Sequence, residues 1–430
     1  MEYHTIITAI LPTVFIIFYF LNLFPKPTKS KLPPGPKPWP IIGNLHLLGD
    51  KPHQSVAKLS RIYGPLMSLK LGSITTIVIS SPDIAKEMFV KHDLAFSSRR
   101  VPHARTAENH DQYSIAWLPV SPKWRTLRKI STIQLFTNQR LDASQGLRQQ
   151  KVNELVQYAS DCCHKSLTVD IGRAAFTTTL NLLSNTFFSI DLAGHGSSSQ
   201  EFKDIVGHLL ELAAKPNVSD FFPMFKSLDL QGLKRQNNAC YHKIFGIFDD
   251  IIGERLKDHK NIGDDVLGTL LKIVKEDELS LDDVKHLLMD LFAAGTDTTA
   301  STLEWAMTEL LRHPEKMTKA QSEIDQVIGK DRPIQESDIS KLTYIQAVMK
   351  ETLRLHPSAP FLIPHKAETD VQFCGYFVPK EAQIWVNVWS IGKDPSVWSK
   401  ADLFLPERFL ENEVDLKGRD FGIIPFGAGR

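Results

Sequence analysis

The chain has 430 residues, of which 42% are hydrophobic and 23% are charged. This composition excludes an intrinsically disordered protein and is sufficient for one large globular domain or two average ones. Lysine and arginine total 50 against 49 aspartates and glutamates, so the net charge of +1 gives no reason to expect a nucleic-acid partner.

The N-terminal segment is predicted to be a membrane anchor. Residues 6–24 carry no charge and are interrupted only by Pro12 and Asn22, which is long enough for a helix that crosses the hydrocarbon core. A cleaved secretory signal is the alternative, but neither a basic leader nor a small-x-small cleavage site precedes Pro25. We therefore expect residues 1–24 to be retained as a single transmembrane helix.

A basic, proline-rich hinge is predicted over residues 25–40. Its lysines directly follow the apolar segment, and the positive-inside rule then places everything downstream on the cytoplasmic side. The run Leu-Pro-Pro-Gly-Pro at residues 32–36, followed by Pro38 and Pro40, fixes φ and removes backbone donors. We expect a stiff extended strap, although this composition alone also fits a plain linker.

The remaining residues, 41–430, are predicted to form one large, mainly helical domain with a small β portion near each end. Residues 68–80 are β-branched and punctuated by glycine, typical of two short strands, and residues 371–388 return to strand character. A helix is expected to begin at Pro82. Apolar residues recur at helical spacing over six further stretches, namely 124–165, 201–215, 241–259, 280–312, 314–328 and 337–354.

The stretch Ala-Ala-Gly-Thr-Asp-Thr-Thr at residues 293–299 is unusual inside the apolar helix that contains it. Gly295 and the β-branched threonines weaken a helix, and Asp297 places a carboxyl group among apolar neighbours. Sequences tolerate such penalties mainly at functional sites, where small residues admit a flat cofactor and an acid beside an alcohol can relay a proton. The alternative is a kinked helix whose threonine hydroxyls bond back to main-chain carbonyls.

Glu351 and Arg354 are three residues apart, so a helix brings them to one face as a possible bidentate ion pair. Glu309 and Arg312 have the same spacing, which shows that the pattern also arises as an ordinary surface ion pair. Glu351 differs because Arg408 downstream supplies a second guanidinium that would close a buried Glu-Arg-Arg network.

Two further features carry less information alone. Trp124 and Arg128 are four residues apart on one predicted helix face, where an indole donor and a guanidinium could together bind a carboxylate. A tryptophan over the core with its arginine in solvent is the simpler interpretation. Residues 425–430 form a Gly-rich loop, which by itself indicates only a tight turn.

In this order and context, these features resemble the cytochrome P-450 superfamily over essentially the whole chain. Residues 294–317 and 340–368 are similar to the plant geraniol 8-hydroxylase-type subgroup, which oxidises monoterpenols. The resemblance implies a cytochrome P-450 fold and a haem b (heme b) cofactor. It also implies that the protein crosses the endoplasmic reticulum membrane once, with its catalytic domain in the cytoplasm. It also implies as partners O2, membrane lipid, a small hydrophobic substrate and an NADPH-dependent flavoprotein reductase. The docking candidates for that reductase are Arg125, Arg128 and Lys129.

The resemblance also assigns roles to single residues. Thr298 matches the distal threonine that hydrogen-bonds bound dioxygen, and Asp297 matches its acidic neighbour in proton delivery. The structural network that braces the proximal side is matched by Glu351, Arg354 and Arg408. The cofactor-binding positions are matched by Trp124, Arg128, His365, Ala294 and Gly295. The substrate pocket, apolar and suited to a small hydrophobic molecule, is matched by Ile115, Ala116, Leu291, Phe361 and Leu362.

The resemblance is incomplete at the haem-ligand loop, which in the family reads Phe-x-x-Gly-x-Arg-x-Cys-x-Gly. Phe426 and Gly429 fill the first two fixed positions, and the sequence ends at Arg430. No metal ligand is therefore assigned, and the axial cysteine is expected beyond Arg430, with the fold incomplete at its C-terminus. Four cysteines lie outside this motif and show neither CxxC spacing nor a disulfide framework: Cys162, Cys163, Cys240 and Cys374.

Two functional hypotheses follow from these expectations. In the first, the 430 residues are part of an active haem-thiolate monooxygenase that hydroxylates a monoterpenol-like compound with O2 and electrons from NADPH. In the second, they are a truncated, catalytically inactive membrane-bound remnant that lacks the axial cysteine. A third class, family members that rearrange peroxides without O2, is disfavoured by the intact pair of Asp297 and Thr298.

Overall fold

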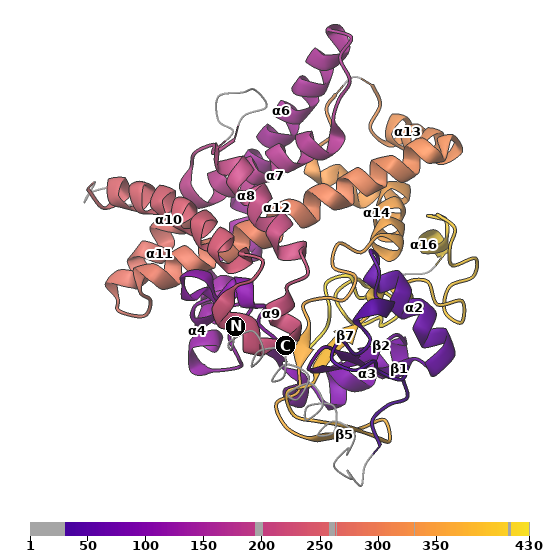
Figure 1. Ribbon diagram of the computed structural model, residues 1–430. Helices are drawn as coiled ribbons and strands as arrows, with labels where there is room; N and C mark the ends of the chain where they lie inside the picture. Colours follow the sequence, from indigo (N-terminus) through magenta and orange to yellow (C-terminus); the bar gives the residue numbers. More distant parts are fainter. Residues whose placement is uncertain are drawn as a thin grey trace, which may run out of the picture.

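The computed structural model describes residues 31–193, 201–257, 263, 265–330, 332–411 and 414–429. Figure 1 shows a large body of helices beside a smaller region in which the strands gather with α2 (Pro52–Tyr63) and α3 (Pro82–Lys91). The predicted mainly helical domain with small β portions is therefore confirmed. The predicted anchor over residues 1–24 lies outside the described residues. Within the described ranges, no helix combines the length and the apolar character that crossing a membrane requires.

Strands from both ends of the domain join in one five-stranded sheet. Its order is β1 (Leu66–Leu71), β2 (Ile74–Ile79), β7 (Gln383–Val386), β4 (His365–Lys366) and β3 (Ser98–Arg99). β1 and β2 form an antiparallel hairpin through Gly72, whose φ of +57° suits a residue without a side chain. β2 then pairs in parallel with β7, which places Thr76 opposite Gln383 although they are 307 positions apart.

The described part of the predicted strap runs along this sheet without helix or strand over residues 31–38. The Ser68 amide and hydroxyl donate to the carbonyls of Pro34 and Pro33, at 2.8 and 2.7 Å. A Cβ built on Gly35 would lie 1.9 Å from the Ser68 carbonyl oxygen, so this close approach requires glycine. A separate two-stranded sheet, formed by β5 (Val371–Phe373) and β6 (Tyr376–Val378), completes the β portion.

The long helix α12 (Leu281–Arg312) runs through the helical body, beside α7 (Ile171–Phe188), α8 (Glu201–Ala214) and α14 (Thr343–Leu355) (Figure 1). Ser280 caps it in a capping box with Asp283, because each side chain accepts the backbone N–H of the other. The helix ends before Pro314, which begins the next helix. The aromatic core around its first half consists of Phe187, Phe188, Phe202, Phe248 and Phe292.

The other helices are α4 (Pro122–Ile130), α5 (Asn138–Ala143), α6 (Gln145–His164), α9 (Val218–Phe221), α10 (Leu233–Lys257), α11 (Val266–Lys275), α13 (Pro314–Val327), α15 (Val388–Ile391) and α16 (Arg408–Glu411). Single-turn and irregular pieces are η1 (Leu45–Leu47), η2 (Leu94–Phe96), η3 (His103–Gln112), the π-helical η4 (Ser131–Leu135), η5 (Pro223–Leu228) and η6 (Glu336–Lys341). The ranges expected for α8, α12 and α13 agree with the structure to within one residue at each end.

Two expectations about helices are corrected. The helix expected over 124–165 is divided into α4, η4, α5 and α6, because Thr137 leaves the helical conformation and caps α5. The helices α2, α7 and α11 were not expected. In α7, three successive threonines at 177–179 each donate to a carbonyl four residues earlier and are mostly buried, so the stretch lacks the polar face that marks a helix in a sequence.

Candidate active site

One face of α12 is exposed at the level of the predicted catalytic residues, although residues 283–293 just before it are all buried or half-buried. Ala294, Asp297 and Thr298 are exposed, whereas Phe292 and Thr296 beside them are buried. Positions 294 and 298 are one helical turn apart and therefore share a side of the helix. The helix thus presents a short face of small and polar residues outside its core.

Gly295 serves helix packing and not this exposed face. A Cβ built on Gly295 would lie 3.0 Å from Cδ1 of Leu183 on α7. The two helices therefore approach each other more closely than a side chain at this position would easily allow. Of Ala294 and Gly295, the two α12 residues expected at the cofactor, only Ala294 is exposed.

The Thr298 hydroxyl donates to the carbonyl of Ala294 at 2.5 Å, which is the back-bonding expected of the alternative interpretation. This back-bonding does not interrupt the helix, because α12 is a continuous α-helix from Leu281 to Arg312. The Thr298 carbonyl accepts hydrogen bonds from the hydroxyls of Thr302, at 2.7 Å, and Ser358, at 3.3 Å. Since a hydroxyl also has two lone pairs, Thr298 Oγ1 can still accept a hydrogen bond on its exposed side.

Asp297 lies next to Thr298 and its carboxyl group is partly shielded from solvent. This partial burial raises the pKa of Asp297 above its usual range, with no cation acting against it. A carboxyl group with a raised pKa holds a proton nearer to neutral pH than an exposed aspartate does. The group is therefore suited to take up and release a proton one residue before Thr298.

Trp124 and Arg128 lie on α4, which Ser121 caps by accepting the Trp124 amide at 3.2 Å. The indole N–H of Trp124 donates to the carbonyl of Ile115 at 3.1 Å. Since an indole has a single donor, Trp124 does not offer the carboxylate-binding N–H that was expected. The Arg128 guanidinium is exposed and lies 5.6 Å from the centre of the Trp124 ring, where its donors remain suited to an anionic ligand.

His365 is buried in β4, and its Nδ1 donates to the carbonyl of Phe96 at 2.6 Å. Burial, together with the nearby Arg99, lowers the pKa of His365 to about 3, so the ring is neutral at physiological pH. The expected basic role of His365 therefore does not fit the structure. Arg99 lies opposite His365 in β3, and burial lowers its pKa only to about 10, so the positive charge here belongs to Arg99. No motif marked Arg99 in the sequence.

We expect His365→Asn to make the free energy of unfolding depend less steeply on pH in the acid range. The folded-state pKa lies below the unfolded value, so His365 stabilises the fold above about pH 6.5 and loses this contribution as the pH falls toward 3. Asparagine keeps an N–H donor for the Phe96 carbonyl but does not titrate. Urea unfolding from pH 7 to 4.5 should show a slope smaller by up to about 1.4 kcal/mol per pH unit in the variant. Parallel curves for the two proteins would contradict this assignment.

The residues expected to line a substrate pocket separate into two groups. Ile115, Ala116 and Leu291 are half-buried where the segment before α4 meets α12. The Phe361 ring instead stacks on Trp385 of β7, with centres 4.5 Å apart, and so packs on the sheet. Leu362, with a φ of +57°, packs against the buried apolar cluster that contains Phe89 and Ile384, and it lies near Gly427. Only the first group lies directly against α12, the helix that carries Thr298.

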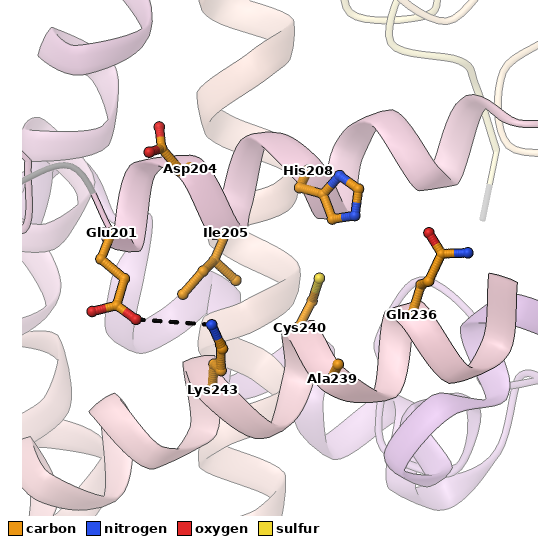
Figure 2. Close-up of a pocket in the computed structure, with 8 residues that line it drawn as sticks. All are labelled: Glu201, Asp204, Ile205, His208, Gln236, Ala239, Cys240 and Lys243. Atoms are coloured by element: carbon orange, nitrogen blue, oxygen red, sulfur yellow. Dashed lines mark ion pairs between the residues drawn. The ribbon is translucent and has the colours of Figure 1, made fainter. Parts of the chain in front are cut away.

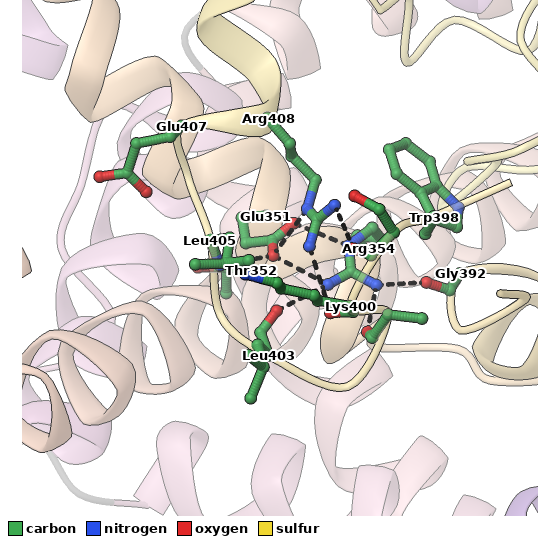
Figure 3. A network of polar contacts seen from close by, with 12 residues as sticks. Glu351, Thr352, Arg354, Gly392, Trp398, Lys400, Leu403, Leu405, Glu407 and Arg408 are labelled. Carbon is green, nitrogen blue, oxygen red and sulfur yellow. Dashed lines mark hydrogen bonds and ion pairs between the residues drawn. The ribbon is translucent and has the colours of Figure 1, made fainter.

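Figure 3 shows that Glu351, Arg354 and Arg408 meet in one network. Arg354 donates to both carboxylate oxygens of Glu351, at 2.7 and 2.8 Å, and Arg408 donates to Oε1 at 3.1 Å. The Leu405 amide also donates to Glu351. The remaining Arg354 donors bind three carbonyls, those of Gly392, Ala401 and Leu403. The network therefore ties α14 to the segment after β7.

Glu309 and Arg312, which share the ExxR spacing, do not form the surface ion pair that the spacing suggested. Glu309 is buried and binds His356 Nε2 at 2.8 Å and lies 3.4 Å from His313 Nδ1, whereas Arg312 is exposed. His356 also stacks on the Trp305 ring, with centres 3.9 Å apart. Equal spacing thus leads to different partners at the two positions.

A hollow between two other helices does not coincide with this site. It has a volume of about 630 Å³ and opens between α8 and α10, as Figure 2 shows. Its base contains Ile205, Ala239 and Cys240, and its rim carries Glu201 and Lys243 at 3.9 Å. None of the predicted catalytic, cofactor or pocket residues lines it, so it is not a candidate for the chemistry.

Comparison with known proteins gives a consistent result. Residues 33–430 match the family model described as cytochrome P450. Cytochrome P450 monooxygenase 76AD131 from Lophophora williamsii is 56% identical, and the match covers all of this chain and 88% of the relative. Geraniol 8-hydroxylase from Catharanthus roseus is 51% identical with the same coverage. Geranylhydroquinone 3''-hydroxylase from Arnebia euchroma is 48% identical and covers 87% of the relative.

The fold is also similar to a solved structure. A solved structure of a zebrafish cytochrome P450 with progesterone aligns with a TM-score of 0.75 and 26% sequence identity. The alignment covers 88% of this chain and 86% of that protein.

Proposed function

The chain belongs to the cytochrome P450 family, and from this premise we propose that it is a membrane-anchored monooxygenase that hydroxylates an acyclic monoterpenol or a similar geranyl compound. The observation that carries the proposal is the exposed face of Ala294, Asp297 and Thr298, which directly follows the buried or half-buried residues 283–293 of α12. Two relatives support the substrate class, because geraniol and geranylhydroquinone, which appear in their names, share a geranyl chain.

The residues present fit a haem with two acid groups. Arg128 on α4 and Arg99 on β3 are cations that can bind carboxylates, and Ala294 leaves space beside α12. When bound, haem supplies the activation of dioxygen. We propose that its axial cysteine follows Arg430, since Phe426 and Gly429 match the start of the ligand loop. Gly427 and Gly429 have positive φ values of 76° and 70°, as a tight loop requires.

The protein groups then have distinct tasks. Partial burial raises the pKa of Asp297, so its carboxyl group takes up a proton more readily than an exposed aspartate does, which suits a proton relay. The Thr298 hydroxyl donates to the Ala294 carbonyl and can accept a hydrogen bond on its exposed side; it would donate its proton toward the substrate side after turning away from that carbonyl. Ile115, Ala116 and Leu291 are half-buried where the segment before α4 meets α12, and they would form an apolar border next to this face.

The proposal includes the cellular setting and the electron donor. Residues 1–24 would anchor the protein in the endoplasmic reticulum membrane with residues 41–430 in the cytoplasm. An NADPH-dependent flavoprotein reductase would dock on the exposed basic surface of Arg125, Arg128 and Lys129. The exposed position of these side chains on α4 supports this assignment.

An isotope experiment tests the proposed function. The haem-loaded protein, with its natural C-terminus, is incubated with a plant reductase, NADPH, ¹⁸O2 and geraniol, and the products are analysed by mass spectrometry. We expect a hydroxylated geraniol that contains a single ¹⁸O atom. If geraniol and related acyclic alcohols all remain unchanged while NADPH is consumed, the substrate class is wrong.

Arg128→Leu should weaken haem binding by about tenfold to 100-fold, because it removes a charge-assisted hydrogen-bond donor for an acid group of the ring. Lys129→Leu is the control, since Lys129 is also an exposed cation of α4 but follows Arg128 directly, so the helix turns its side chain to another side. Haem titration followed by absorbance measures both affinities. Equal affinities for the two variants would argue against a role of Arg128 in haem binding.

A further inference from the structure

A buried polar cluster lies where the segment before α4 meets α12, outside the residues to which a role has been given. It consists of His110, Ser114, His286 and Asp290, which are between 0% and 9% exposed. We call this cluster the clamp. Buried polar side chains are costly unless each has a partner, so a complete cluster of this kind calls for an explanation.

The Asp290 carboxylate is bound entirely by the segment before α4. Its Oδ1 accepts the Ser114 hydroxyl at 2.8 Å, and its Oδ2 accepts the Ile115 amide at 2.8 Å. His110 Nε2 lies 3.1 Å from Oδ1. One acid on α12 therefore gathers three positions of a loop that precedes it by about 175 residues.

The two histidines extend this arrangement. His110 Nδ1 lies 2.8 Å from His286 Nδ1, so one of these nitrogens donates and the other accepts. A proton on His110 Nε2 faces the Asp290 carboxylate, which leaves His110 Nδ1 to accept from His286. Burial, with the nearby His110, lowers the pKa of His286 to about 4, so the ring is neutral. Both rings also contact a tyrosine: His286 stacks on Tyr113, and His110 packs against Tyr241 at a tilt of 39°.

The loop does not hold this shape by local preference. Glu108 and Asn109 both have positive φ values, 48° and 54°, which side-chain-bearing residues adopt only at a cost of about 1–3 kcal/mol each. The Glu108 amide donates to Asn238 of α10 at 3.0 Å. The conformation therefore depends on partners from α10 and α12, and the clamp supplies the partners nearest to Ile115.

The clamp fixes the backbone at the border of the proposed pocket. The Ile115 amide is held by Asp290, and the Ile115 carbonyl accepts the Trp124 indole at 3.1 Å. The Ala116 amide donates to the Ser114 hydroxyl at 3.1 Å. Asp290 precedes Ala294 and Thr298 by one and two helical turns, so the clamp positions this loop beside the exposed face of α12.

Building on the proposed function, we propose that Asp290, supported by His110 and His286, is a specificity-determining positioning residue. It does not touch the reacting atoms. By holding the backbone of Ile115 and Ala116, it sets the wall against which the substrate rests and thereby selects the carbon that faces Thr298. Loss of the clamp would let this wall move and broaden the products.

The test compares Asp290→Leu with Asp290→Asn in the haem-loaded protein. Leucine removes both acceptors, so hydrogen exchange at the Ile115 amide should become at least about tenfold faster, which corresponds to one lost hydrogen bond. The ratio of geraniol products oxidised at different carbons should shift by severalfold. Asparagine retains an acceptor for the Ile115 amide, so it should restore both the slow exchange and the product ratio.

Glu309→Leu is the matched control, because Glu309 is another buried carboxylate of α12 that lies beside two histidines but does not contact this loop. It should leave exchange at Ile115 and the product ratio unchanged. Should Asp290→Leu fail to fold, Ser114→Ala removes one donor to Asp290 and the acceptor for Ala116, and should shift both readouts in the same direction.

The outcomes separate the two proposals. A wild-type protein that makes no geraniol product overturns the proposed function, and the specificity role with it, although faster exchange at Ile115 would still demonstrate the clamp. An active wild type whose product ratio is unchanged in Asp290→Leu and Ser114→Ala overturns the inference alone. An equal shift in Glu309→Leu would also overturn it, because the effect would then come from general weakening of α12.

Discussion

Thr298→Ala should yield a protein that still consumes NADPH but forms hydroxylated product about 100-fold more slowly, at the lower end of the effect of a positioned proton donor. The physical reason is local. Thr298 carries the exposed hydroxyl on this face of α12, next to the raised-pKa carboxyl of Asp297. Without the hydroxyl, no positioned group delivers protons at this site, so more of the electrons from NADPH end in reduced oxygen species and fewer in product. The ratio of product formed to NADPH consumed measures the effect.

Two variants make this test specific. Thr308→Ala removes the same kind of bond, since the Thr308 hydroxyl donates to the carbonyl of Glu304 four residues earlier at 2.7 Å. It should leave the coupling ratio unchanged, because Thr308 is more than two turns beyond Thr298. Thr298→Ser, which keeps a hydroxyl, should restore most of the coupling. A Thr298→Ala protein with wild-type coupling would show that the hydroxyl takes no part in proton delivery.

Arg354→Leu should lower the free energy of unfolding by about 3–5 kcal/mol, the range for breaking a buried ion pair from one side. Arg354 and Glu351 are both fully buried, and Arg354 also binds three carbonyls of the segment after β7. The substitution leaves those three carbonyls without their side-chain donor. The Glu351 carboxylate then keeps only Arg408 and the Leu405 amide as hydrogen-bond donors. Urea unfolding can be followed through Trp398, whose ring lies 5.4 Å from the guanidinium.

Arg312→Leu is the control for this prediction. Arg312 stands three residues after Glu309, as Arg354 stands after Glu351, but it is exposed, and the buried Glu309 binds histidines. Its loss should change stability by less than about 0.5 kcal/mol. If Arg312→Leu and Arg354→Leu destabilise the protein equally, the Glu351 network is not the main source of stability in this region.

The long helices could be predicted because their sequences carry both periodicity and end signals. α12 begins with a capping box at Ser280 and ends before Pro314, and its expected range agrees with the structure to within one residue. α7 could not be predicted in this way. Its threonines satisfy their hydroxyls within the helix and turn toward α12 and the core, so the sequence has no polar stripe to reveal the period.

The candidate site was predictable where short spacing decides the contact. Glu351 and Arg354 meet because a helix places i and i+3 together, and the additional arginine identified which ExxR pair is buried. Prediction failed where a residue's contacts or protonation state depend on a partner distant in the chain. The neutral state of His365 depends on burial against Phe96, which is 269 positions away. The clamp was missed for the same reason, since Asp290 and Ile115 are 175 positions apart.

Haem binding by the protein with its natural C-terminus is the measurement that tests the central claim most directly. Haem is titrated into the folded protein, which is then reduced and exposed to carbon monoxide while the Soret band is recorded. The account predicts saturation at one haem per chain and the Soret position of a thiolate-ligated haem. A folded protein that takes up no haem over the titration would contradict the claim that the exposed face of Ala294 and Thr298 on α12 borders a haem.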